Sequence, residues 1–196
     1  MKHSQLIKKL IAACMIALPT LAFNAHSATR SIVWDPAHNP ATAYRWTEGE
    51  SWHSFIFAGG DEWGVVPDTV DYIATFNVNP APICILDTLV QPGHVVVGDN
   101  GPGYLVITNG GSLIVTNNDW VGIGFVNSTA GYMEITAGGT LFVHDNFWIG
   151  FEPSGVGTFT MKGGTATIEG MTGLGWNGGD RRNAHQWWHL KSLHLA

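Results

Sequence analysis

Few residues of this chain have the types and spacing that chemistry requires. The nearest approach to an acid–base dyad is the adjacent pair His144 and Asp145, but neighbours along a strand point to its opposite sides. A turn at these residues is the simpler interpretation. Between residues 95 and 179 the acids are dispersed, there is no arginine, and Lys162 is the one lysine. Because polysaccharide lyases and hydrolases use clustered carboxylates, often with a basic residue, no catalytic residue is predicted and the chain is not expected to be an enzyme.

Acidic residues gather in one short upstream stretch, at Asp61, Glu62, Asp68 and Asp71. Calcium prefers several oxygen ligands, but this spacing fits no EF-hand loop, so we expect solvated turn positions here. No metal and no other cofactor is predicted. Cys84 is the one cysteine after residue 28, and it is expected to be a small buried hydrophobic side chain rather than a nucleophile.

Tryptophan recurs at comparable positions, at Trp120, Trp148 and Trp176. Exposed aromatic rings bind sugars by stacking, so these three residues are the candidates for a glycan-stacking surface. The alternative is that they stack on one another as a ladder at a corner of the fold. A second group precedes them, at Trp34, Trp46, Trp52 and Trp63. That group is expected to pack as a cap.

The end of the chain, "RRNAHQWWHLKSLHLA", changes character abruptly. His185 and His189 are four residues apart, which is a metal-ligand spacing on a helix. The neighbouring Trp-Trp pair, with the two arginines before it, would suit glycan stacking, nucleic-acid binding or an interfacial anchor. A shift of the reading frame by one base, however, converts Trp187–His189 to Gly-Gly followed by Thr or Ile, as in the repeat described below. Residues 180–196 are therefore predicted to be an aberrant, out-of-frame tail.

Composition bounds the fold class and the partners. The chain has 196 residues, of which 25 are glycine and 12% are charged, and its net charge is −6. Low charge and abundant glycine are typical of an all-β protein with many tight turns. Nucleic acid is excluded as a partner, because neutralising phosphates requires a basic face.

The first residues have the three parts of an export signal. A basic "MKHSQLIKK" is followed by the apolar "LIAACMIALPTLAF" and the small-residue "AHS". Residues 1–28 are predicted to be a secretory signal peptide, which places the mature chain outside the cell, on its surface or in the periplasm. The apolar stretch is too short for a strong membrane span, and none is expected after cleavage.

An internal repeat is the most informative pattern of the sequence. Its units begin at Gly98, Gly124, Gly150 and Gly175, which are separated by 26, 26 and 25 residues. Each unit contains three short β-like runs, as in "YMEIT", "TLFVH" and "WIGF". The order of conserved positions is kept while lengths change slightly, so the insertions fall in turns.

Alternate residues of the first two runs are apolar and are expected to face inward. They are Leu105/Ile107, Met133/Ile135 and Phe159/Met161 in the first run, and Leu113/Val115, Leu141/Val143 and Ala166/Ile168 in the second. Between the runs lie glycine pairs that supply the positive φ of a sharp corner. These repeat-corner glycines are Gly110, Gly111, Gly138, Gly139, Gly163 and Gly164.

Two all-β folds use such a repeat. In a parallel β-helix each unit is one coil, and equivalent residues stack about 4.8 Å apart along the axis. In an antiparallel sandwich or propeller each unit is a pair of hairpins. Because the inward residues match in position and size from unit to unit, a parallel β-helix of about three coils, a short solenoid, is predicted.

The stretch from about Val95 to Gly179 resembles the PEP-CTERM- and type V secretion (autotransporter)-associated repeat. The similarity is carried by "VVVGDNGPGYLVITNGGSLIV", "GYMEITAGGTLFV" and "FWIGFEPSGVGTFTMKGGTATIEGMTGLGWNGG". The resemblance implies an exported bacterial protein and a right-handed parallel β-helix. No PEP-CTERM sorting tail or autotransporter barrel accompanies the repeat here, so the family's route of anchoring does not carry over.

Four segments are predicted: a signal peptide (1–28), an N-terminal β-rich capping segment (29–94), repeats of about 26 residues (95–179) and the aberrant tail (180–196). The expected role is structural or adhesive at the bacterial cell surface, with no reaction of its own, in a truncated fragment of a longer repeat array. Surface polysaccharide, or self-association through the open end of the β-helix, is the expected partner. The alternative is a glycan-binding module or a degraded carbohydrate-active β-helix enzyme.

Overall fold

The chain is an all-β protein. The computed structural model describes residues 30–35, 43–56, 60–77, 83–116, 119–125, 130–152, 154–175 and 193–194. These residues form β-strands and one short 3₁₀ helix, η2 (Gly49–Ser51), and contain no α-helix. In the same residues no helix has the length and apolarity needed to cross a bilayer.

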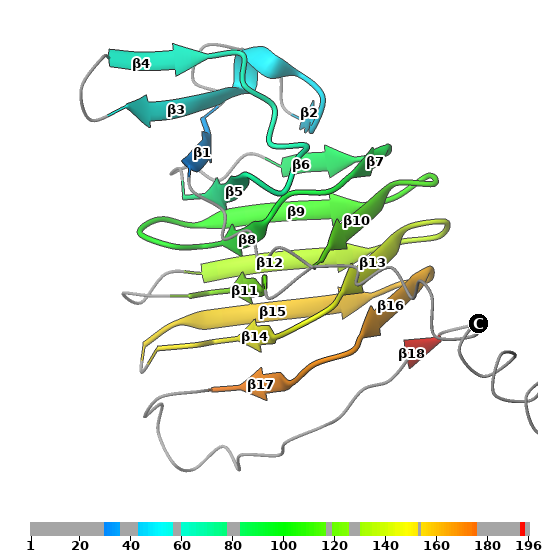
Figure 1. Cartoon of the computed structure of the whole chain (residues 1–196). Coiled ribbons are helices and arrows are strands. Elements are labelled where there is room, and N and C mark those ends of the chain that lie inside the picture. The colour runs from blue at the N-terminus through cyan, green and yellow to red at the C-terminus, as the bar shows by residue number, and fades with distance from the viewer. Residues whose placement is uncertain are drawn as a thin grey trace, which may run out of the picture.

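The strands form three sheets, which we call A, B and C (Figure 1). Sheet A contains, in spatial order, β17 (Thr172–Leu174), β14 (Phe147–Ile149), β11 (Val121–Ile123), β8 (His94–Val97), β5 (Tyr72–Phe76), β1 (Arg30–Trp34), β3 (Trp52–Ile56) and β4 (Gly60–Trp63). Sheet B contains β15 (Val156–Met161), β12 (Ala130–Ile135), β9 (Gly103–Ile107), β6 (Ile83–Leu86) and β2 (Ala43–Arg45). Sheet C contains β18 (Leu193–His194), β16 (Thr165–Ile168), β13 (Thr140–Val143), β10 (Ser112–Val115) and β7 (Leu89–Val90).

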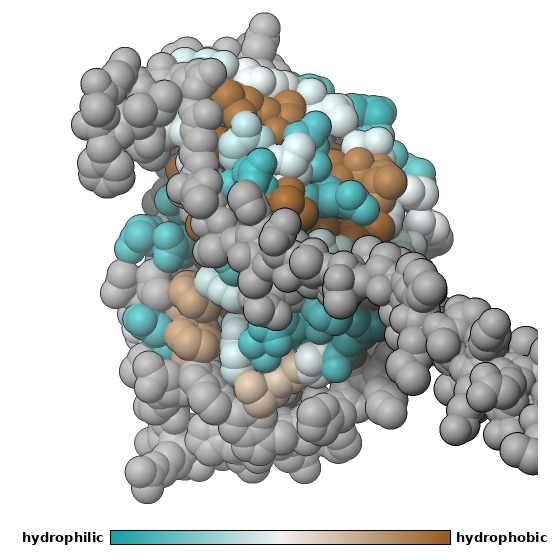
Figure 2. Space-filling model, viewed as in Figure 1, coloured by the Kyte–Doolittle hydropathy of each residue, from teal (hydrophilic) through white to brown (hydrophobic). Residues whose placement is uncertain are grey.

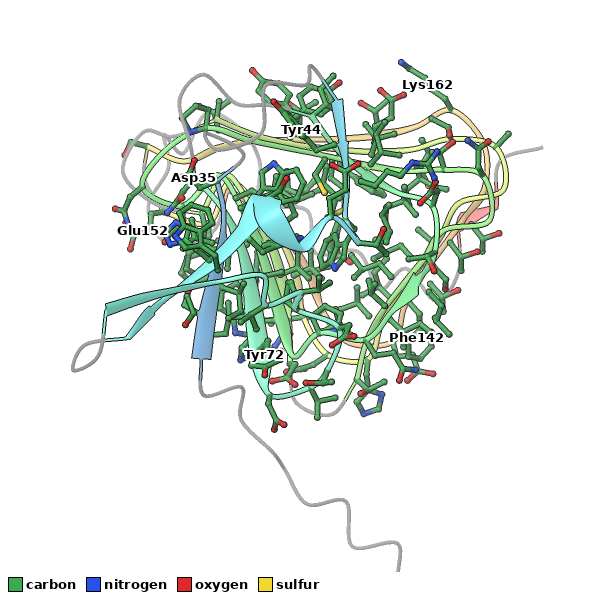
Figure 3. All side chains as sticks on the ribbon, turned by 90° about the horizontal axis from the view of Figure 1, so that it is seen from above. Asp35, Tyr44, Tyr72, Phe142, Glu152 and Lys162 are labelled. Atoms are coloured by element: carbon green, nitrogen blue, oxygen red, sulfur yellow. The ribbon has the colours of Figure 1, made fainter. Side chains whose placement is uncertain are left out.

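The chain visits the three sheets in a fixed order. Strands β5–β6–β7 lie in A, B and C in turn, and the sets β8–β9–β10, β11–β12–β13 and β14–β15–β16 repeat that order. We call each such set a pass. Seen from above, the sheets form three sides around a packed interior, with Lys162 on the side of sheet B, Tyr72 on that of sheet A and Phe142 on that of sheet C (Figure 3). Strands of successive passes pair in parallel, whereas β3, β4 and β18 pair antiparallel with their neighbours.

Equivalent residues of successive passes lie side by side. In sheet B, Leu105 pairs with Met133, and Met133 pairs with Phe159. Sheets C and A follow the same rule, as in Leu113 beside Leu141 and Val95 beside Val121. The side chains expected to face inward are those that pack in the core. Like residues therefore cover like residues, which buries apolar area without changing the backbone from pass to pass.

Three-strand passes begin upstream of the sequence repeat. The residues predicted to be a capping segment (29–94) contribute a complete pass, β5–β6–β7, and the first two strands of another, β1 and β2. Cys84 of β6 pairs with Leu105 in the inward column of sheet B and is fully buried. Its burial raises the pKa of the thiol well above the ordinary value, as predicted for a packed side chain rather than a nucleophile.

Tryptophan side chains close the N-terminal end of the stack. The three buried ones are Trp34, Trp46 and Trp52. Each of the three rings contacts Phe76 on β5, with centroid distances of 6.1, 5.7 and 5.4 Å. The cap expected from the sequence therefore rests on the first complete pass. Trp63 of the same group lies apart, where its ring stacks on that of His53 at 4.6 Å.

The glycine pairs between sheets B and C serve two purposes. Gly110 has a φ of 86°, which supplies the sharp corner. Its neighbour Gly111 does not share the positive φ; a Cβ there would overlap the carbonyl oxygen of Leu86 in the preceding pass. The pair Gly138–Gly139 repeats this division, while both glycines of Gly163–Gly164 have positive φ. The second glycine of the first two pairs is therefore required for close backbone approach rather than for turning.

Candidate functional site

The predicted glycan-stacking tryptophans lie along sheet A. Trp120 is half-buried just before β11, Trp148 lies on β14, and Trp176 falls outside the described residues. The side chain of Trp148 points away from the core, yet only 8% of the residue is exposed. Burial of an outward-facing indole means that another part of the surface covers it.

Other aromatic rings cover these tryptophans. The ring of Trp120 stacks on Phe125 at 4.6 Å and 18°, and Phe125 stacks on Phe151 at 4.6 Å and 13°. Trp148 meets Phe151 edge-on at 5.4 Å. Phe125 and Phe151 each follow the leading glycine of a repeat unit, so the repeat places them in one column. The four residues form a continuous aromatic ladder across two passes.

Glycines on the strands make room for this ladder. A Cβ at Gly122 of β11 would lie 2.9 Å from the ring of Trp120. A Cβ at Gly173 of β17 would overlap the ring of Trp148, which lies across the neighbouring strand. The indole rings therefore lie flat on backbone that carries no side chain. This packing favours the structural alternative for Trp120 and Trp148, because stacking on sugar requires an open ring face.

A buried histidine–aspartate pair anchors the first ring of the ladder. The backbone N–H of Trp120 donates to Nδ1 of His94 at 3.1 Å. Neutral His94 therefore carries its proton on Nε2, which lies 3.2 Å from Oδ1 of Asp119, a residue only 2% exposed. Burial lowers the pKa of His94. Because His94 and Asp119 belong to successive passes, the pair joins one pass to the next.

Sheet B presents an aromatic surface that the sequence analysis did not single out. Tyr104 of β9 and Tyr132 of β12 are paired in register, and their rings stack at 5.5 Å and 20°. Tyr132 is 38% exposed, and its neighbour on β15 is the small, exposed Thr158. One face of the Tyr132 ring therefore lies next to a short side chain that covers little of it. The signal was present in "GYLVIT" and "GYMEIT", where tyrosine recurs at one outward position.

Polar groups flank this tyrosine pair. Nζ of Lys162 lies 2.9 Å from Oε2 of Glu134, which is on the same strand as Tyr132. The hydrogen bond and charge of Glu134 raise the pKa of Lys162, and Tyr104 adds to the shift. An aromatic face beside an ion pair combines stacking with hydrogen-bonding groups, which is the chemistry that binds sugar rings. Glu134 is two residues after Tyr132 on β12, so both side chains lie on the outward face of sheet B.

The outer surface carries apolar patches as well as polar ones. On the face drawn in Figure 2, hydrophobic residues gather in groups between hydrophilic ones. The large exposed apolar and aromatic residues are Trp63, Ile83, Leu89, Tyr132, Val156 and Leu174. Ile83 and Tyr132 both lie on sheet B, on either side of Tyr104 in one outward column. The outward face of sheet B is therefore more open to a ligand than the aromatic ladder of sheet A.

The candidate acid–base groups are not brought together as a dyad. Nδ1 of His144 lies 2.6 Å from Oε2 of Glu169 in the next pass, and His144 and Asp145 occupy a bend after β13, as the turn interpretation predicts. Asp99 and Glu152 are two acids close enough for their charges to interact. Burial, and secondly the negative charge of Glu152, raise the pKa of Asp99.

Metal-ligating groups do not converge in the described residues. Within them, no three His, Cys, Asp or Glu side chains are placed to hold a metal ion. Asp68 and Asp71 are exposed residues between β4 and β5, whereas the side chains of Asp61 and Glu62 are not described. His185 and His189 lie outside the described residues.

Comparison with known proteins gave no relative. No family model, no curated protein and no solved structure matches this chain.

Proposed function

We propose that this chain is an exported bacterial cell-surface repeat protein with a structural or adhesive role, built as a short right-handed parallel β-helix. The observation that carries the proposal is the register of the sheets. Leu105, Met133 and Phe159 follow one another in one inward column, and the same rule holds in all three sheets. A chain wound in this way repeats one backbone shape along an axis.

The outer surface supports a role based on shape. Identical residues recur at one level in two successive passes, as in Tyr104 and Tyr132 on sheet B or Phe125 and Phe151 beside sheet A. A rigid body that displays the same side chain at regular intervals suits repeated contact with a polymer or a neighbouring protein. Adhesion through many weak identical contacts gains strength from their number.

Duplication of one repeat tests the proposed architecture. Inserting a second copy of residues 124–149 after residue 149 would add one strand to each sheet. We expect the maximum dimension from small-angle X-ray scattering to increase by about 4.8 Å, with stability kept or raised. Duplicating 124–136 alone adds a strand to sheet B only and is the matched control, which should unfold more readily. A duplicated chain of unchanged length would contradict the β-helix.

Cell fractionation and adhesion assays test the proposed role. We expect the full chain to be recovered outside the bacterial cytoplasm and a chain lacking residues 1–28 to remain inside. Beads coated with the purified chain should be retained on bacterial cells, and beads coated with heat-unfolded chain should not. Equal retention of the two kinds of bead, or turnover of a polysaccharide by the purified chain, would contradict the proposal.

A second candidate function is glycan binding, and the exposed ring of Tyr132 favours it. We expect Tyr132→Ala to weaken retention of the chain on immobilised bacterial polysaccharide by about tenfold, which corresponds to the loss of about 1.4 kcal/mol of ring stacking. Tyr132→Phe keeps the ring and should keep most of the retention. Trp148→Ala is the comparison on sheet A. If Trp148→Ala abolishes retention and Tyr132→Ala does not, the site lies on the aromatic ladder instead.

A further inference from the structure

The passes interlock through glycines at the corner between sheets A and B. Near the start of three strands of sheet B, β9, β12 and β15, lies a glycine that packs directly on backbone. These glycines are Gly103, Gly131 and Gly157. A Cβ added to Gly103 would lie 2.7 Å from both the amide nitrogen of Gly98 and the carbonyl oxygen of Phe76. Real side chains essentially never come so close, so only glycine fits this position.

The other two glycines meet the same pair of backbone groups. A Cβ at Gly131 would overlap the amide of Gly124 and the carbonyl of Val97, and one at Gly157 would approach the amide of Gly150 and the carbonyl of Ile123. In every case the amide donates to the carbonyl, at 2.8, 2.7 and 2.8 Å. We call this hydrogen bond, with the space above it, a glycine seat. In each seat the amide comes from the leading glycine of a repeat unit (Gly98, Gly124 or Gly150), and the carbonyl comes from the preceding pass.

A fourth seat exists at the C-terminal end of the stack. The amide of Gly175 donates to the carbonyl of Ile149 at 2.9 Å, which repeats the bond beneath the other three seats. No described residue lies within 4 Å of a Cβ placed on Gly175. A hollow of about 500 Å³ opens here, lined by Ile149, Gly150, Val156, Gly157 and Leu174 among others. The hydrogen bond of the fourth seat is therefore present, but among the described residues no glycine occupies the space above it.

The rim of the hollow offers a strand edge. Strand β15 pairs with β12 on one side and is the last strand of sheet B in the described part of the chain. The N–H of Lys162 donates to the carbonyl of Ile135, and successive amides of a strand point to alternate sides, so the N–H of Phe159 points to the open edge. Phe159 and Met161 are partly buried against the core.

The sequence after Gly175 does not match the seat. In the three occupied seats, the glycine in the seat follows the leading glycine of its repeat unit by five, seven and seven residues. The corresponding residues after Gly175 are Asp180 and Arg182, whose side chains the seat would exclude. Gly178 and Gly179 follow Gly175 by three and four residues, a shorter connection than in any occupied seat.

We propose that the fourth glycine seat and the edge of β15 form an acceptor site for a β-strand from another polypeptide. The strand begins with glycine and then alternates polar and apolar residues, as residues 131–135 do. Its glycine packs on the bond between Gly175 and Ile149, and its backbone pairs with β15 in parallel. Its two apolar residues cover Phe159 and Met161, as Met133 and Ile135 are covered within the chain. The site extends the interface that already joins the passes, and it rests on the proposed stacking architecture.

Peptide binding to the full chain tests the acceptor site. The probe is a fluorescent peptide of residues 129–137, TAGYMEITA, and binding is followed by anisotropy. The matched peptide carries Gly131→Ala. We expect the glycine peptide to bind in the micromolar range and the alanine peptide at least tenfold more weakly, because its methyl group meets the carbonyl of Ile149. Absence of binding by the glycine peptide, or equal binding by both, would overturn the proposal.

Two exposed leucines locate the site on the protein. Leu174 lines the hollow and is 41% exposed, whereas Leu89 on β7 is 57% exposed and lies on sheet C. Leu174→Asp should abolish peptide binding and Leu89→Asp should leave it unchanged, with circular dichroism confirming that both variants fold. Equal loss in both variants, or no loss in Leu174→Asp, would place the peptide elsewhere and overturn the assignment. Failure here leaves the duplication and adhesion tests of the proposed function intact.

Discussion

The two ends of the described stack of passes differ in how much of their apolar surface is covered. At the N-terminal end, three tryptophans cover Phe76, and the hairpin of β3 and β4 continues sheet A (Figure 1). At the other end, the fourth glycine seat and Leu174 remain uncovered by described residues. A stack of identical passes always exposes apolar side chains and strand edges at its ends. The comparison teaches that covering the end of a stack takes residues outside the repeat, such as the three tryptophans at the N-terminal end.

The largest contrast between the ends should appear in tryptophan substitution. Trp52 is fully buried, and its Nε1–H donates to the carbonyl of Trp46 at 2.7 Å. Trp52→Ala should lower the free energy of unfolding by about 3–5 kcal/mol, because it leaves a cavity under the cap. Urea denaturation followed by circular dichroism measures the change. A loss below about 1 kcal/mol would show that the cap does not hold the first pass.

The interior of the stack should be nearly as sensitive at an occupied glycine seat. Gly131→Ala adds a methyl group where the carbonyl of Val97 lies, so the neighbouring passes must separate. We expect a loss of about 1–3 kcal/mol in urea denaturation. Ala137→Gly is a control in the same unit, at an exposed turn residue, and should change stability little. Equal effects of both substitutions would mean that the seat is not a tight contact.

An intermediate effect is expected from pH at the joint between two passes. Burial lowers the native-state pKa of His94 below its ordinary value of 6.5. The unfolded chain therefore binds the proton more readily than the native chain does. Stability should therefore fall as the pH drops through about 6.5, and the fall should level off below the native pKa. Urea midpoints at pH 7.5 and 5.0 measure this. His94→Asn keeps an acceptor for the N–H of Trp120 and should show a smaller drop; an unchanged drop would assign the effect to other groups.

The smallest effect is expected at the uncovered end. Leu174 is 41% exposed, so truncation to alanine removes little buried area. Leu174→Ala should change the free energy of unfolding by about 0.5 kcal/mol or less. If urea denaturation instead shows a loss comparable with that of Trp52→Ala, the C-terminal end is as well covered as the N-terminal end, and the contrast between them disappears.

The internal repeat allowed much of the packing to be predicted. Leu105, Met133 and Phe159 share a face because apolar residues alternate along each run, and alternation is a local property of strands. The corner at Gly110 followed from glycine's access to positive φ. The early pass β5–β6–β7 was not predicted, because its runs lack the leading glycine that marks the later units.

The candidate sites were harder to predict than the packing. Trp120 and Trp148 were identified from their recurrence, but their burial depends on Phe125 and Phe151, which come from other positions of the unit. Conversely, Tyr132 was missed although its position repeats, since exposure depends on the neighbour in the next pass. In this chain that neighbour is Thr158, a small residue. No single unit contains that information.

The sequence by itself determined which residues turn inward and where the chain bends, because both depend on alternation and on glycine within one unit. Only the tertiary structure decided which residue lies above which. A neighbour one pass away is about 26 residues distant in the chain, and its size decides whether a ring is covered or open. The glycine seats belong to this second class: each is made by the backbone of two passes, and no local pattern shows that the fourth one is left uncovered by described residues.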